Sequence, residues 1–415
     1  MNSIKTVYRE FPHKFWVVVG VSFIDRVGGT LLFPFFALYI TQKFGVGMTQ
    51  AGIILGILSI FGLFGGIIGG ALSDRFGRRK VILFGLISSA LSTLALGSVN
   101  EFLALYPLAA IIGLLSDVGG PAHGAMIADI LPEEQRQEGF GILRVAGNMA
   151  WIVGPSIGGF VANKSFFALF VIDAVVSCVV ALLFYLLMPE TKPETEAGQP
   201  HESTLQTFKG YGLVARDLAF VAFLGAGILM GLVYQQMYNS LSVYLRDVHG
   251  VSSQGYGFLL TVSAITVILF QFWTMRRLKL RPPFLLMAFG TLFYMVGFGM
   301  FGVVSRYWLF ALAIFIITVG EMIVMPTSQA LVARFAPEEM RGRYMAFFGL
   351  AWMIPATIGP GAAGIILDNY NPNLLWVIGA GLCAVSALGF YALHLKLGSR
   401  PRFVPVPAEP GAVVA

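Results

Sequence analysis

The sequence repeats itself at a constant offset of 205 residues. The stretch at 132–136, which reads PEEQR, returns at 337–341 as PEEMR, and Gly154-Pro155 returns as Gly359-Pro360. The two cysteines of the chain, Cys178 and Cys383, keep the same spacing. A constant offset over so many positions indicates two copies of one structural unit, in the same orientation and with almost no net insertion.

Composition places both copies in a membrane. The chain has 415 residues, of which 57% are hydrophobic and 12% are charged, and its mean hydropathy is +0.80. Soluble domains carry about 25% charged residues, so about half of the usual charge is missing. Parallel repeats in so apolar a chain are typical of secondary transporters, whose substrate site lies between the two halves.

Hydropathy predicts an all-α integral membrane protein with twelve transmembrane helices, in two six-helix bundles related by pseudo-two-fold symmetry. The N-terminal bundle then covers 1–188 and the C-terminal bundle 217–396. Between them, 189–216 is predicted to be a flexible cytoplasmic linker with a short surface helix at 203–216, and 397–415 a cytoplasmic tail. The expected spans lie at 15–40, 49–73, 80–99, 102–130, 139–163, 166–188, 217–245, 253–275, 283–304, 307–334, 343–367 and 373–396.

The distribution of basic residues predicts the orientation. Of the 27 Lys and Arg residues, 21 fall in segments on the side of the N-terminus, four in loops on the other side and two inside helices. Cytoplasmic loops carry the excess of positive charge. Both termini are therefore predicted to be cytoplasmic, with the chain in the cell membrane (inner or plasma membrane).

The loop between the second and third predicted helices carries a motif. Residues 70–80 read GALSDRFGRRK, which by charge alone would be an ordinary positive-inside loop. The spacing resembles the GxxxD(R/K)xGRR(K) signature of the major facilitator superfamily, whose members have six plus six helices and a central cavity. The residues assigned by this resemblance to a cytoplasmic gate are Gly70, Asp74, Arg75, Gly77, Arg78, Arg79 and, at the end of the fourth helix, Asp129.

Two further motifs extend the resemblance over residues 1–400. Gly320-Glu321 with Pro326 in the tenth helix resembles the drug:proton antiporter group. The start of the fourth helix, 106–113, lacks the arginine that these exporters usually carry, so Arg26 or Arg144 would have to replace it. The fifth helix resembles the GxxxGPxxGG motif of proton-driven exporters through Asn148, Gly154, Pro155, Gly158 and Gly159.

The resemblance implies roles for these motifs. Asp74 would cap a cytoplasmic helix end, that of the eleventh helix, because carboxylates favour helix N-termini. The loop arginines would bridge to acids such as Asp129 and stabilise an outward-facing state. Neutralising Asp74 is then expected to impair transport and to leave membrane insertion intact. The proline of the fifth helix removes a backbone hydrogen bond and permits a bend, with a packing seam as the alternative.

Ionisable residues inside the predicted helices are few. Each costs at least ~2.5–3.5 kcal/mol at the bilayer centre, so each needs a partner, water or a function. We expect Asp25 to approach Arg144, either as a proton-exchanging pair or as a static ion pair. Glu321 is predicted to bind a proton or a cationic substrate, with a structural neutral acid as the alternative. The predicted proton-coupling residues are Asp25, Arg26, Asp117, Arg144 and Glu321.

Aromatic residues are abundant in the first, fifth, seventh and eleventh helices. Cavity-lining aromatics suit flat, lipophilic or cationic solutes, although lipid contact and ordinary packing explain most such residues. Asp173 lies in the sixth helix. In the superfamily that the sequence resembles this helix is peripheral, so an interfacial or structural role is expected for Asp173. The predicted substrate cavity comprises Phe36, Trp151, Tyr234, Tyr238, Trp352 and Glu321.

Together these features predict a proton-coupled antiporter that exports drugs or other lipophilic, cationic compounds by alternating access. The alternative is a proton-coupled importer of peptides or other small solutes, because Asp25-Arg26 and the tenth-helix glutamate faintly resemble the peptide transporters. The first glutamate of their motif falls on Ser22. The sequence has no Walker loop, GxSxG motif or metal-ligand cluster. We therefore expect a monomer that needs a small-molecule substrate, protons and the lipid bilayer, without enzyme activity, cofactor, metal or nucleic acid.

Overall fold

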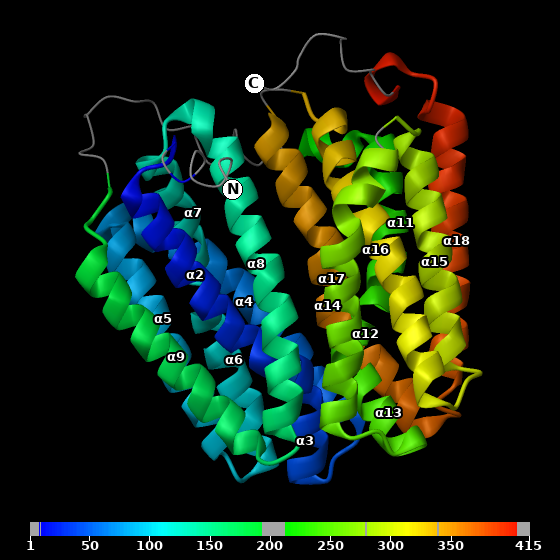
Figure 1. Ribbon diagram of the computed structural model, residues 1–415, viewed down its shortest axis with the longest axis horizontal. Coiled ribbons are helices and arrows are strands. Elements are labelled where there is room, and N and C mark those ends of the chain that lie inside the picture. The colour runs from blue at the N-terminus through cyan, green and yellow to red at the C-terminus, as the bar shows by residue number, and fades with distance from the viewer. Residues whose placement is uncertain (1–7, 9, 193–211, 279, 338–339, 405–415) are drawn as a thin grey trace. The chain divides into compact units, whose positions relative to one another are not determined.

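The computed structural model describes residues 8, 10–192, 212–278, 280–337 and 340–404 (Figure 1). Over these residues the chain is helical and contains no strand. The all-α prediction is therefore confirmed. The surface helix expected at 203–216 falls largely outside the described residues.

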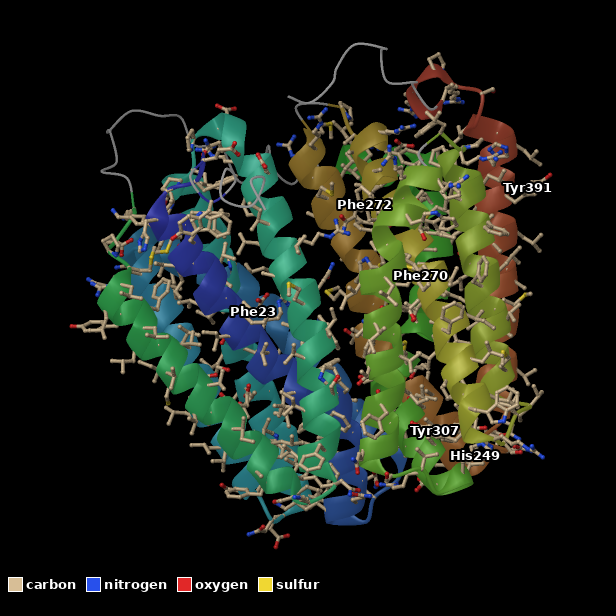
Figure 2. The ribbon with its side chains drawn as sticks, viewed as in Figure 1. Phe23, His249, Phe270, Phe272, Tyr307 and Tyr391 are labelled. Carbon is tan, nitrogen blue, oxygen red and sulfur yellow. The ribbon has the colours of Figure 1, made fainter. Side chains whose placement is uncertain are left out.

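Twelve helical segments of the described chain are long and apolar enough to cross a bilayer, as predicted. Each predicted span overlaps one of them. Large apolar side chains are exposed along these segments, including Leu91, Leu186 and, labelled in Figure 2, Phe272 and Tyr391. A chain in water would bury such side chains, whereas lipid tails solvate them.

The first span is interrupted after its twentieth residue. It consists of α2 (His13–Leu32), a 3₁₀ turn η1 (Phe33–Phe35) and α3 (Phe36–Phe44). Pro34 lies within η1, where its missing N–H and fixed φ end the preceding α-helix. The next spans are α4 (Met48–Phe76), α5 (Arg78–Ser98), η2 (Phe102–Ala104) with α6 (Leu105–Ser116) and α7 (Gly119–Ile130), α8 (Glu133–Ala162), and α9 (Phe166–Leu187).

The second copy begins with a span that is also interrupted, into α11 (Leu218–Tyr234), α12 (Gln236–Asn239) and α13 (Leu241–His249). The break after Tyr234 lies close to the position equivalent to η1 under the 205-residue offset. The remaining elements are α14 (Ser253–Leu278), α15 (Pro283–Phe301), α16 (Tyr307–Phe335), α17 (Arg341–Asn369), α18 (Leu374–Leu397) and the 3₁₀ turn η4 (Pro401–Phe403).

Packing partners repeat between the two copies. In the first copy α2 packs against α8 and α9, and α5 packs against α9. In the second copy the equivalent helices pair in the same way, α11 with α17 and α18, and α15 with α18. The sequence repeat therefore corresponds to a repeat of tertiary structure.

Glycines allow the closest helix crossings of the first copy. A Cβ at Gly65 or Gly69 of α4 would lie 2.2 Å from the Leu114 carbonyl oxygen or 2.1 Å from that of Val118. On α8, a Cβ at Gly154 would lie 2.1 Å from Oγ1 of Thr30. Contacts below about 3 Å leave no room for a side chain, so these backbones touch directly. The predicted fifth-helix motif thus forms a packing seam against α2.

The described chain divides into two compact units. One contains the described residues up to 192 together with 238–261, and the other contains 212–237 together with the described residues from 262 to 404. Residues 238–261 belong to the second copy by sequence but group with the first unit. The predicted boundaries at 188 and 217 are not tested by this division and stay predictions.

Candidate functional site

The first unit contains a cavity of about 640 Å³, within the size range of small-molecule sites. Residues of α2, α5, α6, α7 and α8 line it, and Phe23 of α2, labelled in Figure 2, is one of them. Its walls combine hydroxyl groups, aromatic rings and charged side chains. The charged or titratable lining residues are Asp25, Arg26, Asp117 and His123.

Asp117 lies at a break in the fourth span. The α-helix stops at Ser116 and resumes at Gly119, and Asp117 between them has φ −111° and ψ 10°. Its carboxylate lies beside two glycines: a Cβ at Gly120 would be 2.5 Å from Oδ1, and one at Gly66 would be 3.0 Å from Oδ2. Non-helical backbone at membrane depth is tolerated where it lines a cavity, which makes this break a site feature.

Arg26 is the shared cation of the cavity. Its charge acts on Asp25 of α2, on Asp117 in the break between α6 and α7, and on His123 of α7. The guanidinium lies against α8 at Gly147, where a Cβ would be 3.5 Å from Nε. Of the two arginines predicted for coupling, the structure therefore brings Arg26 together with both N-terminal acids.

The expected approach of Asp25 to Arg144 stays a prediction. Arg144 is exposed on α8 and is not among the residues that line the cavity. The acid whose charge acts on Asp25 is Asp173, which is buried in α9 and accepts a 2.8 Å hydrogen bond from Oγ1 of Thr93. Hydropathy does not predict which face of α8 is turned toward the cavity, because apolar residues occur on all faces of the helix.

The predicted cavity aromatics fall into separate groups. Trp151 and Phe33 line the cavity with ring centroids 6.2 Å apart, and Tyr238 lies 4.8 Å from Trp151. Phe36 is elsewhere: it is 5% exposed and packs against Tyr39 at 6.2 Å. Asn148 on α8 is exposed and lies outside the cavity lining.

Glu321 belongs to a cluster within the second unit. The Tyr234 hydroxyl hydrogen-bonds to its carboxyl group, and Oε2 is buried without a hydrogen-bond partner in the described chain. The Tyr234 ring packs edge-on against Trp352 at 5.9 Å. Three of the predicted substrate residues, Tyr234, Trp352 and Glu321, are therefore neighbours.

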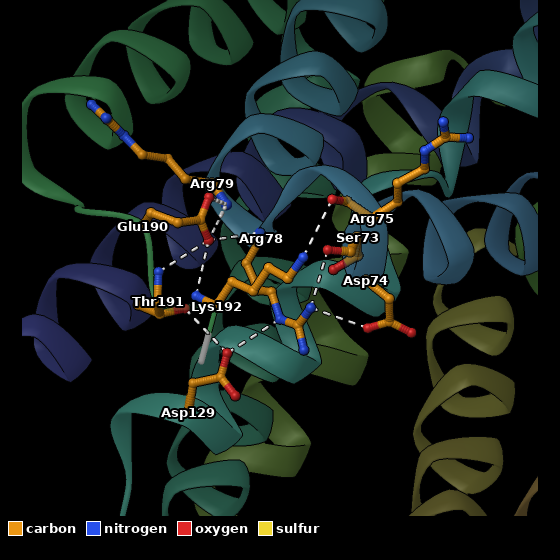
Figure 3. A network of polar contacts seen from close by, with 9 residues as sticks. All are labelled: Ser73, Asp74, Arg75, Arg78, Arg79, Asp129, Glu190, Thr191 and Lys192. Atoms are coloured by element: carbon orange, nitrogen blue, oxygen red, sulfur yellow. Dashed lines mark hydrogen bonds and ion pairs between the residues drawn. The ribbon is translucent and has the colours of Figure 1, made fainter. Parts of the chain in front are cut away.

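The loop motif forms an ion-pair network with the end of the fourth span (Figure 3). Arg78 donates to Asp129 at 3.2 Å and to Asp74 at 3.1 Å, so the predicted partner Asp129 is found. Asp129 also accepts from the Thr191 hydroxyl at 3.3 Å. Arg78 and Asp129 are mostly covered, whereas the Asp74 side chain is 78% exposed.

The other residues of the motif have separate contacts. The guanidinium of Arg75 lies 5.3 Å from the Phe76 ring, and that of Arg79 lies 4.8 Å from the Tyr185 ring and donates to the Tyr185 carbonyl. Gly70 faces Pro121, whose Cβ would be 3.8 Å from a Cβ at that position. The motif thus joins α4, α5, α7 and α9 at one end of the bundle.

Glu190, just after α9, is a residue of this network that the sequence did not single out. Its carboxylate accepts hydrogen bonds from the backbone N–H groups of Arg78 at 2.8 Å, Arg79 at 3.2 Å, Thr191 at 3.0 Å and Lys192 at 3.1 Å. Burial raises the pKa of the Glu190 carboxyl, but these donors outweigh it and hold the pKa below its usual value. Glu190 therefore caps the N-terminus of α5.

Gly77 permits this cap. Its backbone has φ 98° and ψ 158°, a conformation that residues with side chains rarely adopt. A Cβ at Gly77 would also lie 2.3 Å from Oε2 of Glu190. The glycine of the motif is thus required both by the turn between α4 and α5 and by the carboxylate from the following segment.

Within the described residues, no group of three or more His, Cys, Asp or Glu side chains could hold a metal ion. The cavity is lined instead by carboxylates, hydroxyl groups and aromatic rings, which suit proton exchange and the binding of organic solutes.

The family model described as Major Facilitator Superfamily matches residues 18–360 and 257–414. The chain belongs to the major facilitator superfamily. Its members, including the relatives below, are transporters and not enzymes.

Two curated relatives within the major facilitator superfamily carry functional names. One is a Na(+), Li(+), K(+)/H(+) antiporter of Planococcus maritimus, 28% identical over 80% of this chain and 84% of the relative. The other is the multidrug resistance protein MdtH of Salmonella typhimurium, 24% identical over 93% of this chain and 94% of the relative.

Solved structures of other transporters share the fold. A peptide transporter POT in complex with sulfate superposes with a TM-score of 0.78 at 18% identity, covering 95% of this chain and 96% of that one. A POT family transporter in complex with 5-aminolevulinic acid gives a TM-score of 0.79 at 16% identity, covering 93% and 96%. At such identities the likeness concerns the fold alone.

Proposed function

We propose that this chain is a proton-coupled antiporter of the cell membrane, which exports lipophilic or cationic compounds by alternating access. The observation that carries the proposal is the cavity of the first unit, where Asp25 and Asp117 lie with Arg26 beside aromatic rings. Two carboxylates held by one permanent cation leave one negative charge to be neutralised. A proton or a cationic substrate can do so, and the two then compete for the same site.

Exchange follows from this competition. A cationic substrate that enters the deprotonated cavity is attracted by the unpaired carboxylate and by the faces of Phe33 and Trp151. Protonation on the other side of the membrane neutralises the carboxylate and releases the cation. Because the site cannot hold both, each cycle moves proton and substrate in opposite directions.

Glu321 supplies a second acid in the other unit. Its Oε2 is buried without a hydrogen-bond partner in the described chain, and Tyr234 bonds to the same carboxyl. Such an acid is suited to alternate between a proton and a cationic substrate that stacks on Tyr234 or Trp352. The relative named as a multidrug resistance protein fits this class of substrate.

A second candidate substrate is a monovalent metal cation. Hydroxyl groups of Ser22, Ser89 and Ser116 line the cavity beside the two carboxylates, and such oxygen ligands suit hard cations. The relative named as a Na(+), Li(+), K(+)/H(+) antiporter has this activity in its name. The same cavity would then exchange protons for the bare ion.

Everted membrane vesicles test the proposal directly. With a respiratory proton gradient reported by acridine orange, adding tetraphenylphosphonium or ethidium should release protons, and a protonophore should abolish the response. NaCl, LiCl and KCl are added separately to test the second candidate. Uptake of a dipeptide with no response to any of these would support the importer and contradict both proposals.

Variants then locate the coupling. Asp25→Asn, Asp117→Asn and Glu321→Gln should each lower exchange at least about tenfold, which corresponds to 1.4 kcal/mol. The matched control is Glu101→Gln, an exposed acid in the loop before α6. Normal exchange by all three variants would show that protons are carried elsewhere.

A further inference from the structure

We propose that a second cavity of the first unit binds a phosphate group, either that of a phospholipid headgroup or that of free inorganic phosphate. This cavity has a volume of about 540 Å³ and lies at the C-terminal end of α8, the opposite end from the loop motif. It shares no lining residue with the cavity around Asp25 and Asp117. The site is therefore separate from the exchange proposed above.

Two turns form the walls of the second cavity. One is the turn between α8 and α9, and the other connects α13 to α14. Both belong to the first unit, because residues 238–261 group with it, and α13 packs against α3. The polar and charged side chains that line the cavity include Gln42, Asn163, Lys164, Ser165, Arg246 and Ser252.

The second cavity gathers positive charge. Lys164 and Arg246 are two of the four basic residues in the loops on the side opposite to the N-terminus. Of the described residues that line the cavity, none is acidic. The Lys164 ammonium group lies 4.7 Å from the centre of the Phe160 ring, and none of the described ion pairs includes it. The cavity therefore offers an ammonium group that no described carboxylate neutralises.

Arg246 is held in place with part of its guanidinium left for a ligand. Its Nη1 donates to Oγ1 of Thr41 at 3.0 Å, and its Nε and Nη2 donate to the Asp247 carboxylate at 2.5 Å and 2.9 Å. A guanidinium has five N–H groups, so two remain beyond these three contacts. Asp247 does not line the cavity, and its side chain is 53% exposed. Its carboxylate thus competes with an anion for the same guanidinium.

Two serine hydroxyl groups add donors at the starts of two helices. Oγ of Ser165 accepts a hydrogen bond from the Ala168 N–H of α9 at 3.3 Å, and Oγ of Ser252 accepts one from the Gly255 N–H of α14 at 3.1 Å. Each hydroxyl keeps its own proton to donate to a ligand. Both helix N-termini also favour negative charge, which adds to the attraction of the two basic side chains.

A phosphate group fits this set of donors. It presents more acceptor oxygens than a carboxylate and forms charge-assisted hydrogen bonds with Arg and Lys. One membrane span ends at Ala162 and two begin at Phe166 and Ser253, so the cavity lies at the level where a bilayer has its headgroups. Phe160 and Phe167, both about half exposed, provide apolar surface for acyl chains beside it. A phospholipid is therefore the expected source of the phosphate.

Calorimetric titration of the purified full chain in a nonionic detergent tests the proposal. Sodium phosphate and dihexanoyl-phosphatidylglycerol are titrated separately at low ionic strength, where screening is weakest. Lys164→Gln and Arg246→Gln should each weaken binding of the phospholipid about fivefold. Arg306→Gln removes an exposed basic residue before α16 that does not line the cavity, and should leave the affinity unchanged.

Asp247→Asn should have the opposite effect. It frees the Arg246 guanidinium from its carboxylate partner, so binding should tighten by about twofold to fivefold. The matched control is Glu101→Gln, which removes an exposed acid between α5 and α6 at the same end of these helices. A merely structural role for Arg246 would not produce this gain. If Arg246→Gln does not fold, Lys164→Gln and Asp247→Asn still decide, because both change exposed side chains.

The two probes distinguish the sources of the phosphate. Binding of the phospholipid that inorganic phosphate does not displace would identify a headgroup site, whereas displacement at equal affinity would identify a site for free phosphate. No binding of either probe, or equal affinities in the wild type, Lys164→Gln and Asp247→Asn, would overturn the inference. None of these measurements involves transport, so their failure would leave the proposed exchange standing.

Discussion

Replacing Gly77 with alanine should destabilise the protein more than any other substitution of a positive-φ glycine. The backbone at φ 98° and ψ 158° alone costs a residue with a side chain of order 1–3 kcal/mol. The new Cβ would also lie 2.3 Å from Oε2 and 2.7 Å from Cδ of Glu190, so the carboxylate must move. Losing two of its backbone hydrogen bonds adds roughly 1–3 kcal/mol, toward the lower end because Glu190 is exposed.

The matched control is Gly45→Ala. Gly45 has φ 62°, and nothing lies within 4 Å of its Cβ position, so its cost is the backbone alone, about 1–2 kcal/mol. Thermal unfolding in detergent, followed by loss of the monodisperse peak in size-exclusion chromatography, should show a melting temperature reduced about twice as much by Gly77→Ala. Equal reductions would refute the steric reasoning.

A double-mutant cycle isolates the contribution of Glu190. In a Glu190→Ala background the clash is absent, so Gly77→Ala should cost only its backbone part. The two substitutions together should therefore destabilise less than the sum of the singles, by about 1–2 kcal/mol. Additive costs would mean that Gly77 and Glu190 are independent.

Two further predictions concern the same bundle. The pKa of Glu190 is lowered in the folded protein, so its stabilising effect is fully present above the ordinary glutamate value of about 4.5 and is lost as the pH falls through the lower folded pKa. The melting temperature of the wild type should accordingly drop on acidification in this range, and that of Glu190→Gln should drop less; parallel curves would contradict the cap. On α8, Gly154→Ala should clash with Thr30 of α2, force the two helices apart and cost roughly 1–3 kcal/mol, whereas Gly141→Ala, with nothing within 4 Å, should be neutral or stabilising. If the two alanine variants unfold at the same temperature, the seam between α2 and α8 is not tightly packed.

The spans could be predicted from the sequence because the bilayer fixes their length and excludes charge. The pairing of Arg78 with Asp129 was also accessible, since both lie at ends of predicted helices in a recognisable motif. Glu190 was not, because the N–H groups that tie it to α5, those of Arg78 and Arg79, lie 112 and 111 residues earlier, and the sequence around it reads as a linker. The proline and glutamate content of 189–216 indicates a linker, but it does not predict that Glu190 at its start binds the N-terminus of α5.

Helix rotation accounts for most of the remaining differences. When all faces of a helix are apolar, hydropathy does not say which face meets a neighbour. Arg144 was predicted to approach Asp25 and Phe36 to line the substrate cavity, and neither is among the residues that line the cavity of the first unit. Asp173 was expected to have an interfacial or structural role. Its carboxylate lies against Gly28 of α2, and hydropathy does not predict that contact.

The break at Asp117 has a mechanical consequence. It leaves α7 as a separate rod of twelve residues, roughly 18 Å long, with the cavity acid at its start. His123 lines the cavity from the middle of the rod, and Asp129 at its far end holds Arg78. A tilt of this rod about the break at Asp117 would displace both of its ends together, so that a change at the acid would reach Arg78 through α7 itself.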